Sequence, residues 1–112
     1  MALMPRGEVR WADLSQGRGR EQAGRRPVLV LSHDVFNDRS GTVIAMAVTS
    51  RPQKAGFPLS PEIETEGLPK RSRVKISQVR TLAADRIGDS ITQLAPEELS
   101  RVVDGLNEII GD

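Results

Sequence analysis

Two short motifs in the sequence combine residue types that can bind a phosphate group. In the first, Arg26 and the proline after it precede the apolar run Val28–Leu31, so its guanidinium should stand at the start of a buried strand. In the second, Thr49 and Ser50 follow the apolar run Val43–Val48. A fixed guanidinium and a hydroxyl beside it can each bind a phosphate oxygen. If the two strands are neighbours, the motifs predict a phosphate site. They do not decide whether this site only binds a phosphate or also catalyses a reaction on it.

The composition excludes several other kinds of site. The 112 residues contain no cysteine and a single histidine, His33. This excludes disulfides, zinc fingers, Cys-His nucleophile pairs and two-histidine acid/base catalysis. The clustered carboxylates of residues 34–38 and 62–66 lie in polar stretches without a second histidine, and we interpret them as solvated charge. We expect no metal ion and no cofactor.

Two nucleotide-binding modules are not favoured. The stretch Gly17–Arg20 is rich in glycine, but it lacks the Lys-Ser/Thr pair of a phosphate-binding loop. A base-stacking platform needs more aromatic residues than Trp11, Phe36 and Phe57, because we expect Trp11 and one phenylalanine to lie in the core.

The charge distribution favours a partner that bears phosphates. Residues 1–80 contain 14 lysines and arginines against 8 acids, a net charge of +6, whereas residues 81–112 have a net charge of −5. Arginine outnumbers lysine 13 to 3, and its planar fork binds phosphate oxygens bidentately. A solvated surface, typical of an arginine-rich composition, explains the charge equally well.

The length and the apolar pattern predict one small domain over residues 1–112. Alternation predicts a first strand over Glu8–Leu14, with Val9 and Trp11 or their neighbours turned inward. An exposed loop over residues 15–26 should follow, and Ser32 should cap a short helical turn at residues 33–37. The other expected strands are Val28–Leu31, a central Thr42–Thr49, Phe57–Glu64, Arg73–Leu82 and Ser90–Leu94.

The C-terminal residues form the clearest helical pattern. Six apolar residues recur at helical spacing, and Pro96 suits the first turn while Gly111 suits the end; the six are Leu99, Val102, Val103, Leu106, Ile109 and Ile110. Strands joined by short turns and followed by one helix predict the α+β class, with a mostly antiparallel barrel or sheet. No apolar run is long enough to cross a membrane, so a cytoplasmic protein is expected.

Four ordered motifs together resemble the MazF/PemK toxins. They are Arg6–Leu14, Gly19–Val30, Thr42–Ser50 and Gln78–Thr81, and the resemblance extends from Arg6 to Ile110. It implies an SH3-like barrel with a C-terminal helix, a homodimer, and an antitoxin whose tail occupies the RNA groove. It also implies a sequence-specific, metal-independent endoribonuclease (mRNA interferase) that cleaves single-stranded RNA. Attack by the 2′-hydroxyl would leave a 2′,3′-cyclic phosphate and a 5′-hydroxyl.

The resemblance assigns roles to particular residues. The family's catalytic positions fall on Arg26, which would stabilise the phosphorane charge, and on Thr49, which would hold a non-bridging oxygen. An arginine pKa above about 12 makes it a poor base, so charge stabilisation is the expected role. The expected RNA-binding residues are Glu21, Gln22, Arg25, Ser50, Gln78 and Arg80.

Two alternatives come from other functional classes. A gyrase poison of the CcdB type would share the fold but act by binding protein, and such proteins end in Trp-Gly-Ile, whereas this chain ends Ile110-Gly111-Asp112. A non-enzymatic single-strand binder would bind RNA without cutting it, and would do so without Arg26.

Overall fold

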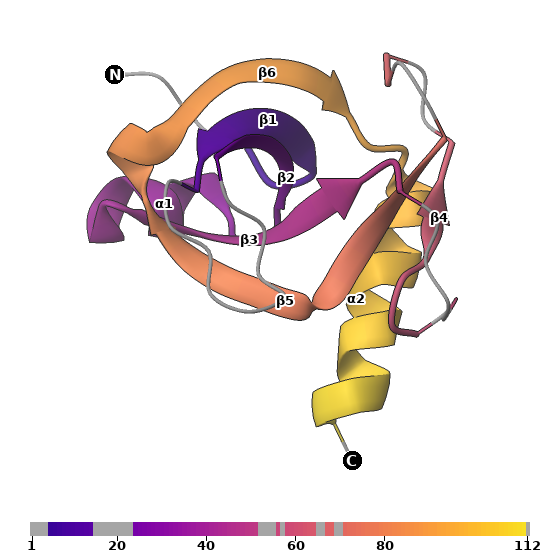
Figure 1. The fold of residues 1–112 in the computed structure, drawn as a ribbon. Helices are drawn as coiled ribbons and strands as arrows, with labels where there is room; N and C mark the ends of the chain where they lie inside the picture. Colours follow the sequence, from indigo (N-terminus) through magenta and orange to yellow (C-terminus); the bar gives the residue numbers. More distant parts are fainter. Residues whose placement is uncertain are drawn as a thin grey trace.

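The computed structural model describes residues 5–14, 24–51, 56, 58–64, 67–68 and 71–111. Six strands form one antiparallel sheet in the order β4-β5-β3-β2-β1-β6. The sheet curls into an open barrel, and the C-terminal helix packs beside β5 (Figure 1). The elements are β1 (Glu8–Asp13), β2 (Arg25–Val30), α1 (Asp34–Ser40), β3 (Thr42–Thr49), β4 (Glu62–Ile63), β5 (Ser72–Ala83), η1 (Ala84–Arg86), β6 (Ile87–Gln93) and α2 (Pro96–Ile110). This confirms the predicted antiparallel SH3-like barrel with a C-terminal helix.

The central strands β2 and β3 bury apolar side chains on both faces of the sheet, since side chains alternate between the faces along each strand. The face covered by α2 has a cluster that includes Leu29, Met46, Ile76 and Val102. The opposite face has a second cluster built mainly from small and branched residues: Ala12, Leu14, Val28, Val30, Val43, Ala45 and Leu82. Two-sided burial explains why β2 and β3 are continuous apolar runs rather than alternating ones.

The predicted strands differ in how closely they match the structure. The central strand is confirmed as β3, with the bounds that the sequence predicts. β2 begins at Arg25, three residues earlier than expected, because it pairs with β1 before β3 joins it. The strand predicted over Phe57–Glu64 is wrong over most of its length: among the described residues there, only Glu62–Ile63 pairs with β5, while residues 58–60 form a turn and bend.

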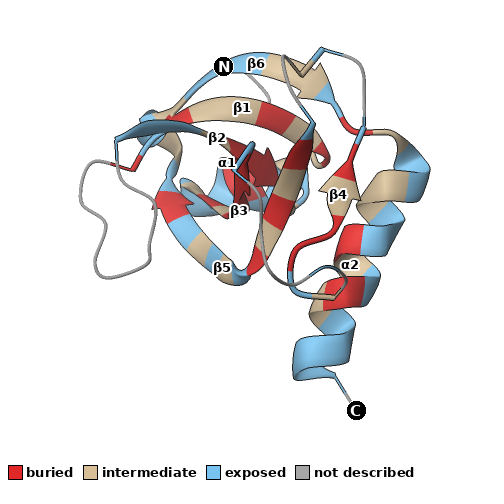
Figure 2. Ribbon diagram, turned by 45° about the vertical axis from the view of Figure 1, so that its right-hand side comes forward, coloured by how far each residue is buried: buried red, intermediate tan, exposed pale blue. Residues whose placement is uncertain are grey.

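Helix α2 confirms the C-terminal helical pattern, with one correction to its apolar stripe. Val102 is fully buried against the sheet, and Leu99 and Leu106 pack around the same cluster. Ile109 and Ile110 remain 42% and 70% exposed, because the last turn extends past the sheet (Figure 2). No helix among the described residues is long and apolar enough to cross a membrane.

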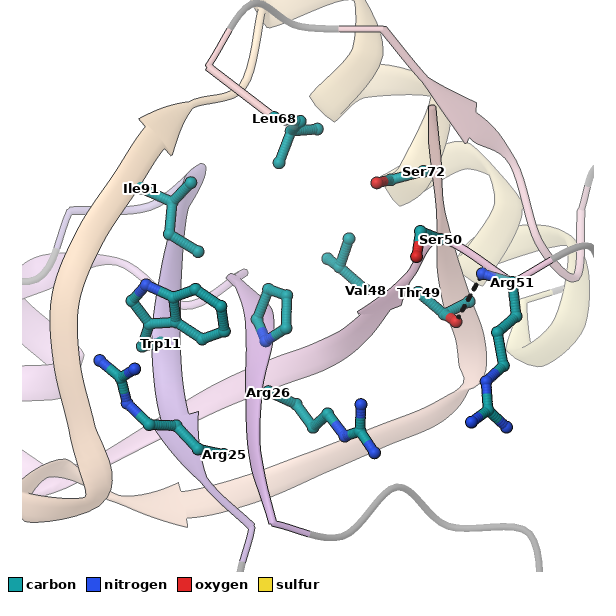
Figure 3. Close-up of a pocket in the computed structure, with 11 residues that line it drawn as sticks. Trp11, Arg25, Arg26, Val48, Thr49, Ser50, Arg51, Leu68, Ser72 and Ile91 are labelled. Atoms are coloured by element: carbon teal, nitrogen blue, oxygen red, sulfur yellow. Dashed lines mark hydrogen bonds between the residues drawn. The ribbon is translucent and has the colours of Figure 1, made fainter. Parts of the chain in front are cut away.

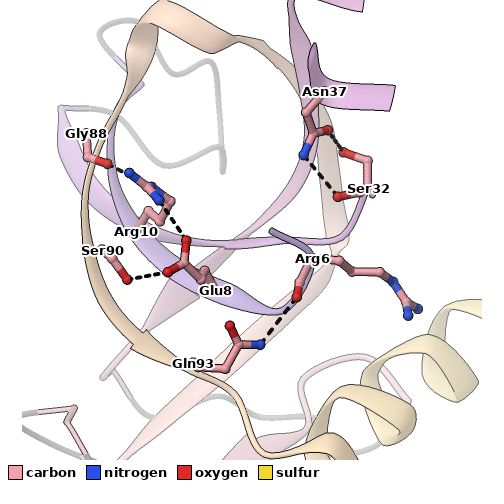
Figure 4. Close-up of polar contacts among 8 residues, drawn as sticks. All are labelled: Arg6, Glu8, Arg10, Ser32, Asn37, Gly88, Ser90 and Gln93. Carbon is pink, nitrogen blue, oxygen red and sulfur yellow. Dashed lines mark hydrogen bonds and ion pairs between the residues drawn. The ribbon is translucent and has the colours of Figure 1, made fainter. Parts of the chain in front are cut away.

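A polar network joins the neighbouring strands β1 and β6 at one edge of the sheet (Figure 4). The Glu8 carboxylate lies 2.6 Å from Arg10 and accepts a hydrogen bond of 2.9 Å from the Ser90 hydroxyl. Arg10 Nε also donates to the Gly88 carbonyl at 2.8 Å. These contacts join β1 to β6 where the ladder between them shifts register, so side chains hold the two strands together where the backbone pairing is irregular.

The predicted cap of α1 is wrong. The N-cap is His33, which is exposed and makes no side-chain capping bond. Ser32 instead donates its hydroxyl to the buried Asn37 (Figure 4). It also accepts a 2.9 Å hydrogen bond from the Ile44 N–H. Because β3 offers Ser32 an unpaired backbone donor, the serine ties the helix to the sheet rather than capping it.

Candidate active site

The site forms where strands β2 and β3 separate. Their ladder ends at the pair Val28 and Ala47. Beyond it, β2 pairs with β1 alone and β3 pairs with β5 alone. Extending the register by two residues would set Arg26 opposite Thr49. The two motifs predicted to bind phosphate therefore face each other across the gap between the strands.

A cavity of about 410 Å³ occupies this gap (Figure 3). Residues from strands β1, β2, β3, β5 and β6 and from the segments around Ser50 and Leu68 form its walls. The lining residues are Trp11, Arg25, Arg26, Pro27, Val48, Thr49, Ser50, Arg51, Leu68, Ser72 and Ile91. Proline is tolerated in β2 because β3 is not paired there and needs no N–H from it.

The Thr49 hydroxyl is held in place by the chain that follows it. Thr49 is only 8% exposed, and its Oγ1 accepts a 3.1 Å hydrogen bond from the backbone N–H of Arg51. With a lone pair engaged in this way, the hydroxyl can still donate its proton to a ligand oxygen. Arg26 and Arg51 are exposed and extend from the cavity walls on either side of Thr49 in Figure 3.

Trp11 lines the cavity. The expectation that Trp11 lies in the core is therefore wrong. The register pairs Val9 with Leu29 and Trp11 with Pro27, so Val9 and Trp11 share one face, as alternation predicts. Val9 is fully buried there. Trp11 is only partly buried, because β3 has separated from β2 at its level and cannot cover it.

The structure brings together four of the predicted site residues. Arg25, Arg26, Thr49 and Ser50 all line the cavity. Two others, Gln78 and Arg80, are partly buried on β5 and are not among its lining residues. Glu21 and Gln22 lie outside the described residues.

Outside the two motifs, sequence reasoning missed five residues of the cavity: Trp11, Arg51, Leu68, Ser72 and Ile91. Arg51 could have been predicted from the sequence, because it directly follows Thr49 and Ser50 in a basic stretch. The others come from segments distant in sequence, and only the curling of the sheet brings them to the gap between β2 and β3.

The chemistry of the cavity is that of a phosphate site. Three guanidinium groups and three hydroxyls line it, and no carboxylate or imidazole is found among these lining residues. Within the described part of the chain, no three His, Asp or Glu side chains group as metal ligands. Guanidinium groups and hydroxyl donors suit an anionic oxygen better than any neutral ligand. Fold and cavity together define a small barrel protein with a binding site for a phosphodiester.

Comparisons with known proteins give the family. Residues 5–110 match the model of the PemK-like, MazF-like toxins of type II toxin-antitoxin systems. Endoribonuclease EndoA of Bacillus subtilis is 40% identical over 93% of this chain and 91% of its own. Endoribonuclease MazF of Staphylococcus saprophyticus is 38% identical over 97% and 92%. A crystal structure of MazF from Deinococcus radiodurans superposes with a TM-score of 0.85 at 25% identity, covering all of both chains. The chain belongs to the MazF/PemK toxin family.

Proposed function

We propose that the cavity is the active site of an endoribonuclease toxin that cleaves single-stranded RNA without a metal ion. The observation that carries this proposal is the position of Arg26 and Thr49 on one cavity, where the register of two adjacent strands sets them opposite each other. The family match and the endoribonuclease names of the relatives support the same activity. They do not favour the alternative of a gyrase poison.

The proposed reaction uses a nucleophile that belongs to the substrate. The 2′-oxygen forms a bond to phosphorus as the bond from phosphorus to the 5′-oxygen breaks, which leaves a 2′,3′-cyclic phosphate and a 5′-hydroxyl. The 2′-hydroxyl loses one proton and the leaving oxygen gains one, so no water is consumed. Negative charge grows on the non-bridging oxygens in the transition state, where fixed donors contribute most.

The two residues have different roles in this step. Arg26 stabilises the added charge as a permanent cation, because a guanidinium is too weak a base to remove the proton. Thr49 donates its hydroxyl proton to a non-bridging oxygen, held in orientation by the Arg51 N–H. Arg25 and Ser50 contact the adjacent backbone from the same cavity.

Recognition of the RNA sequence is proposed to involve residues beyond the cavity. Glu21, Gln22, Gln78 and Arg80 are the candidates for contacts to base edges, since contacts to phosphates position a strand while contacts to bases specify it. We propose that residues 1–112 act as one MazF/PemK-like toxin domain, as a homodimer, in the cytoplasm. An antitoxin is the expected protein partner, and acidic side chains on it would suit the arginines of the cavity.

Cleavage in the presence of a chelator tests this function. Purified protein incubated with a long single-stranded RNA in EDTA should produce discrete fragments whose 5′ ends are hydroxyls and whose 3′ ends are cyclic phosphates. Intact RNA under these conditions, or ends of another chemistry, would contradict the proposal.

Two matched assays separate the alternatives. Inhibition of DNA supercoiling without RNA cleavage would support a gyrase poison. RNA gel shifts that persist in Arg26→Ala, with no cleavage by either protein, would support a non-enzymatic binder.

A further inference from the structure

The phosphate-binding groups occupy only part of the cavity, and the remaining walls are apolar. Trp11, Val48, Leu68 and Ile91 form these walls, and Val48 also belongs to the buried core cluster. In Figure 3 the Trp11 indole lies between Arg25 and Ile91, across the cavity from the hydroxyl groups. The cavity thus has one end that suits a phosphate and another that suits a flat apolar group.

Two contacts hold the apolar end in shape. The Arg25 guanidinium lies over the Trp11 ring, 4.6 Å from its centroid, a cation–π contact that restrains the indole. Gly67 has φ +102°, and a Cβ there would lie 2.9 Å from the Thr92 side chain on β6. Glycine therefore allows this turn to approach β6, which brings Leu68 to the cavity. A wall built before the ligand arrives lowers the entropy cost of binding.

A single nucleotide has the same two-part chemistry as the cavity. Its phosphate is anionic, and its base is a flat π-system. A volume of about 410 Å³ is at the lower end of the range for small-ligand sites, roughly 300–1,000 Å³, which suits one nucleotide rather than several. Stacking on aromatic side chains is a general way in which proteins hold the bases of single strands.

We propose that Trp11, supported by Ile91 and Leu68, stacks on the base of one nucleotide that flanks the scissile phosphate. This inference rests on the proposed ribonuclease function. Trp11 is then a positioning residue, because the stacked base fixes the phosphate between Arg26 and Thr49. Stacking does not read the edges of a base, so this subsite requires a base but tolerates its identity.

An abasic scan tests the proposal. Once the cleavage site is mapped, short RNAs are made that each lack one base near it, and kcat/KM is measured for each. We expect one flanking position at which loss of the base lowers kcat/KM by about 5- to 150-fold, the range of base–aromatic stacking. Trp11→Ala should lower kcat/KM on intact RNA by a similar factor, with no further loss when that base is absent.

Control variants separate stacking from a structural effect. Trp11→Phe keeps a ring and should keep most of the base dependence. Val9→Ala removes a buried side chain from the same strand, so it should lower activity on intact and abasic RNA equally. If Trp11→Ala does not fold, Ile91→Ala provides the test from another wall. A ratio of intact to abasic activity that stays at the wild-type value in the Trp11 and Ile91 variants would overturn the proposal.

Fluorescence gives a readout that does not depend on cleavage. Trp11 is the only tryptophan in the sequence, so its emission reports on the cavity directly. An oligonucleotide with a 2′-deoxy sugar at the cut site should change this emission on binding, whereas a base-free sugar–phosphate chain should bind without the change. Equal emission in the two complexes would refute stacking. Absence of RNA cleavage would contradict the proposed function, and the emission experiment would still decide whether a base stacks on Trp11.

Discussion

The two ends of strands β2 and β3 differ although they belong to the same pair of strands. Over residues 28–30 and 45–47 the strands are paired, and their side chains are fully or almost fully buried. Over residues 25–27 and 48–49 the pairing has ended, and the side chains line a cavity instead. The paired end supplies stability through apolar burial, and the separated end supplies a cavity lined by arginines and hydroxyls. The pairing between β2 and β3 therefore determines both where the core forms and where the site begins.

The largest expected effect belongs to the paired end. Leu29→Ala removes a fully buried side chain from the central core cluster and should lower the free energy of unfolding by about 2–5 kcal/mol. Chemical denaturation measures this loss. The activity per folded molecule should change little, because Leu29 does not line the cavity. A variant with wild-type stability would show that the core is not centred on this pair of strands.

The next largest effect is expected at the separated end, where a substitution should lower activity and leave stability nearly unchanged. Arg26→Ala should lower kcat/KM on RNA by a few hundredfold, on the order of 3 kcal/mol of transition-state stabilisation. Because Arg26 is exposed, the free energy of unfolding of the variant should stay within about 0.5 kcal/mol of the wild-type value. Steady-state kinetics tests the loss of activity, and thermal unfolding of the same preparation tests the unchanged stability. Full activity would remove Arg26 from the mechanism.

A smaller effect is expected at Thr49. Thr49→Val removes the hydroxyl with little change in shape and should reduce kcat by roughly 5- to 150-fold, the value of one hydrogen bond of about 1–3 kcal/mol. Thr49→Ser retains the hydroxyl and serves as the matched control, with activity close to that of wild type. If the serine and valine variants were equally impaired, packing rather than hydrogen bonding would be the role of Thr49.

The smallest expected effect concerns the point at which the strands separate. Pro27 lies in β2 next to the last residue paired with β3. Pro27→Ala should lower the free energy of unfolding by about 0.4–1 kcal/mol, mainly because the unfolded chain becomes more flexible. Calorimetry can detect this shift. A gain in stability would indicate that proline strains β2 and that the strands would otherwise pair further.

Much of the fold could be predicted because its signals are local. The apolar run of β3 and the helical spacing of α2 are each contained in one segment, and both predictions are confirmed. The prediction over residues 57–64 failed because residues 58–60 turn and bend instead of extending, so only Glu62–Ile63 pairs with β5. The cap at Ser32 was wrongly predicted because its hydrogen-bond partner Ile44 lies twelve residues further along the chain, on β3.

The sequence by itself determined which residue types are present for chemistry: arginines and hydroxyls at strand ends, one histidine and no cysteine. It also determined the apolar runs that must be buried, because burial depends on local composition and period. Only the tertiary structure decided that β2 and β3 separate after Val28, that Arg26 then faces Thr49, and that Trp11 lies on the cavity instead of in the core. These outcomes depend on the register between strands, which arises from packing across the whole sheet and cannot be read from any one segment.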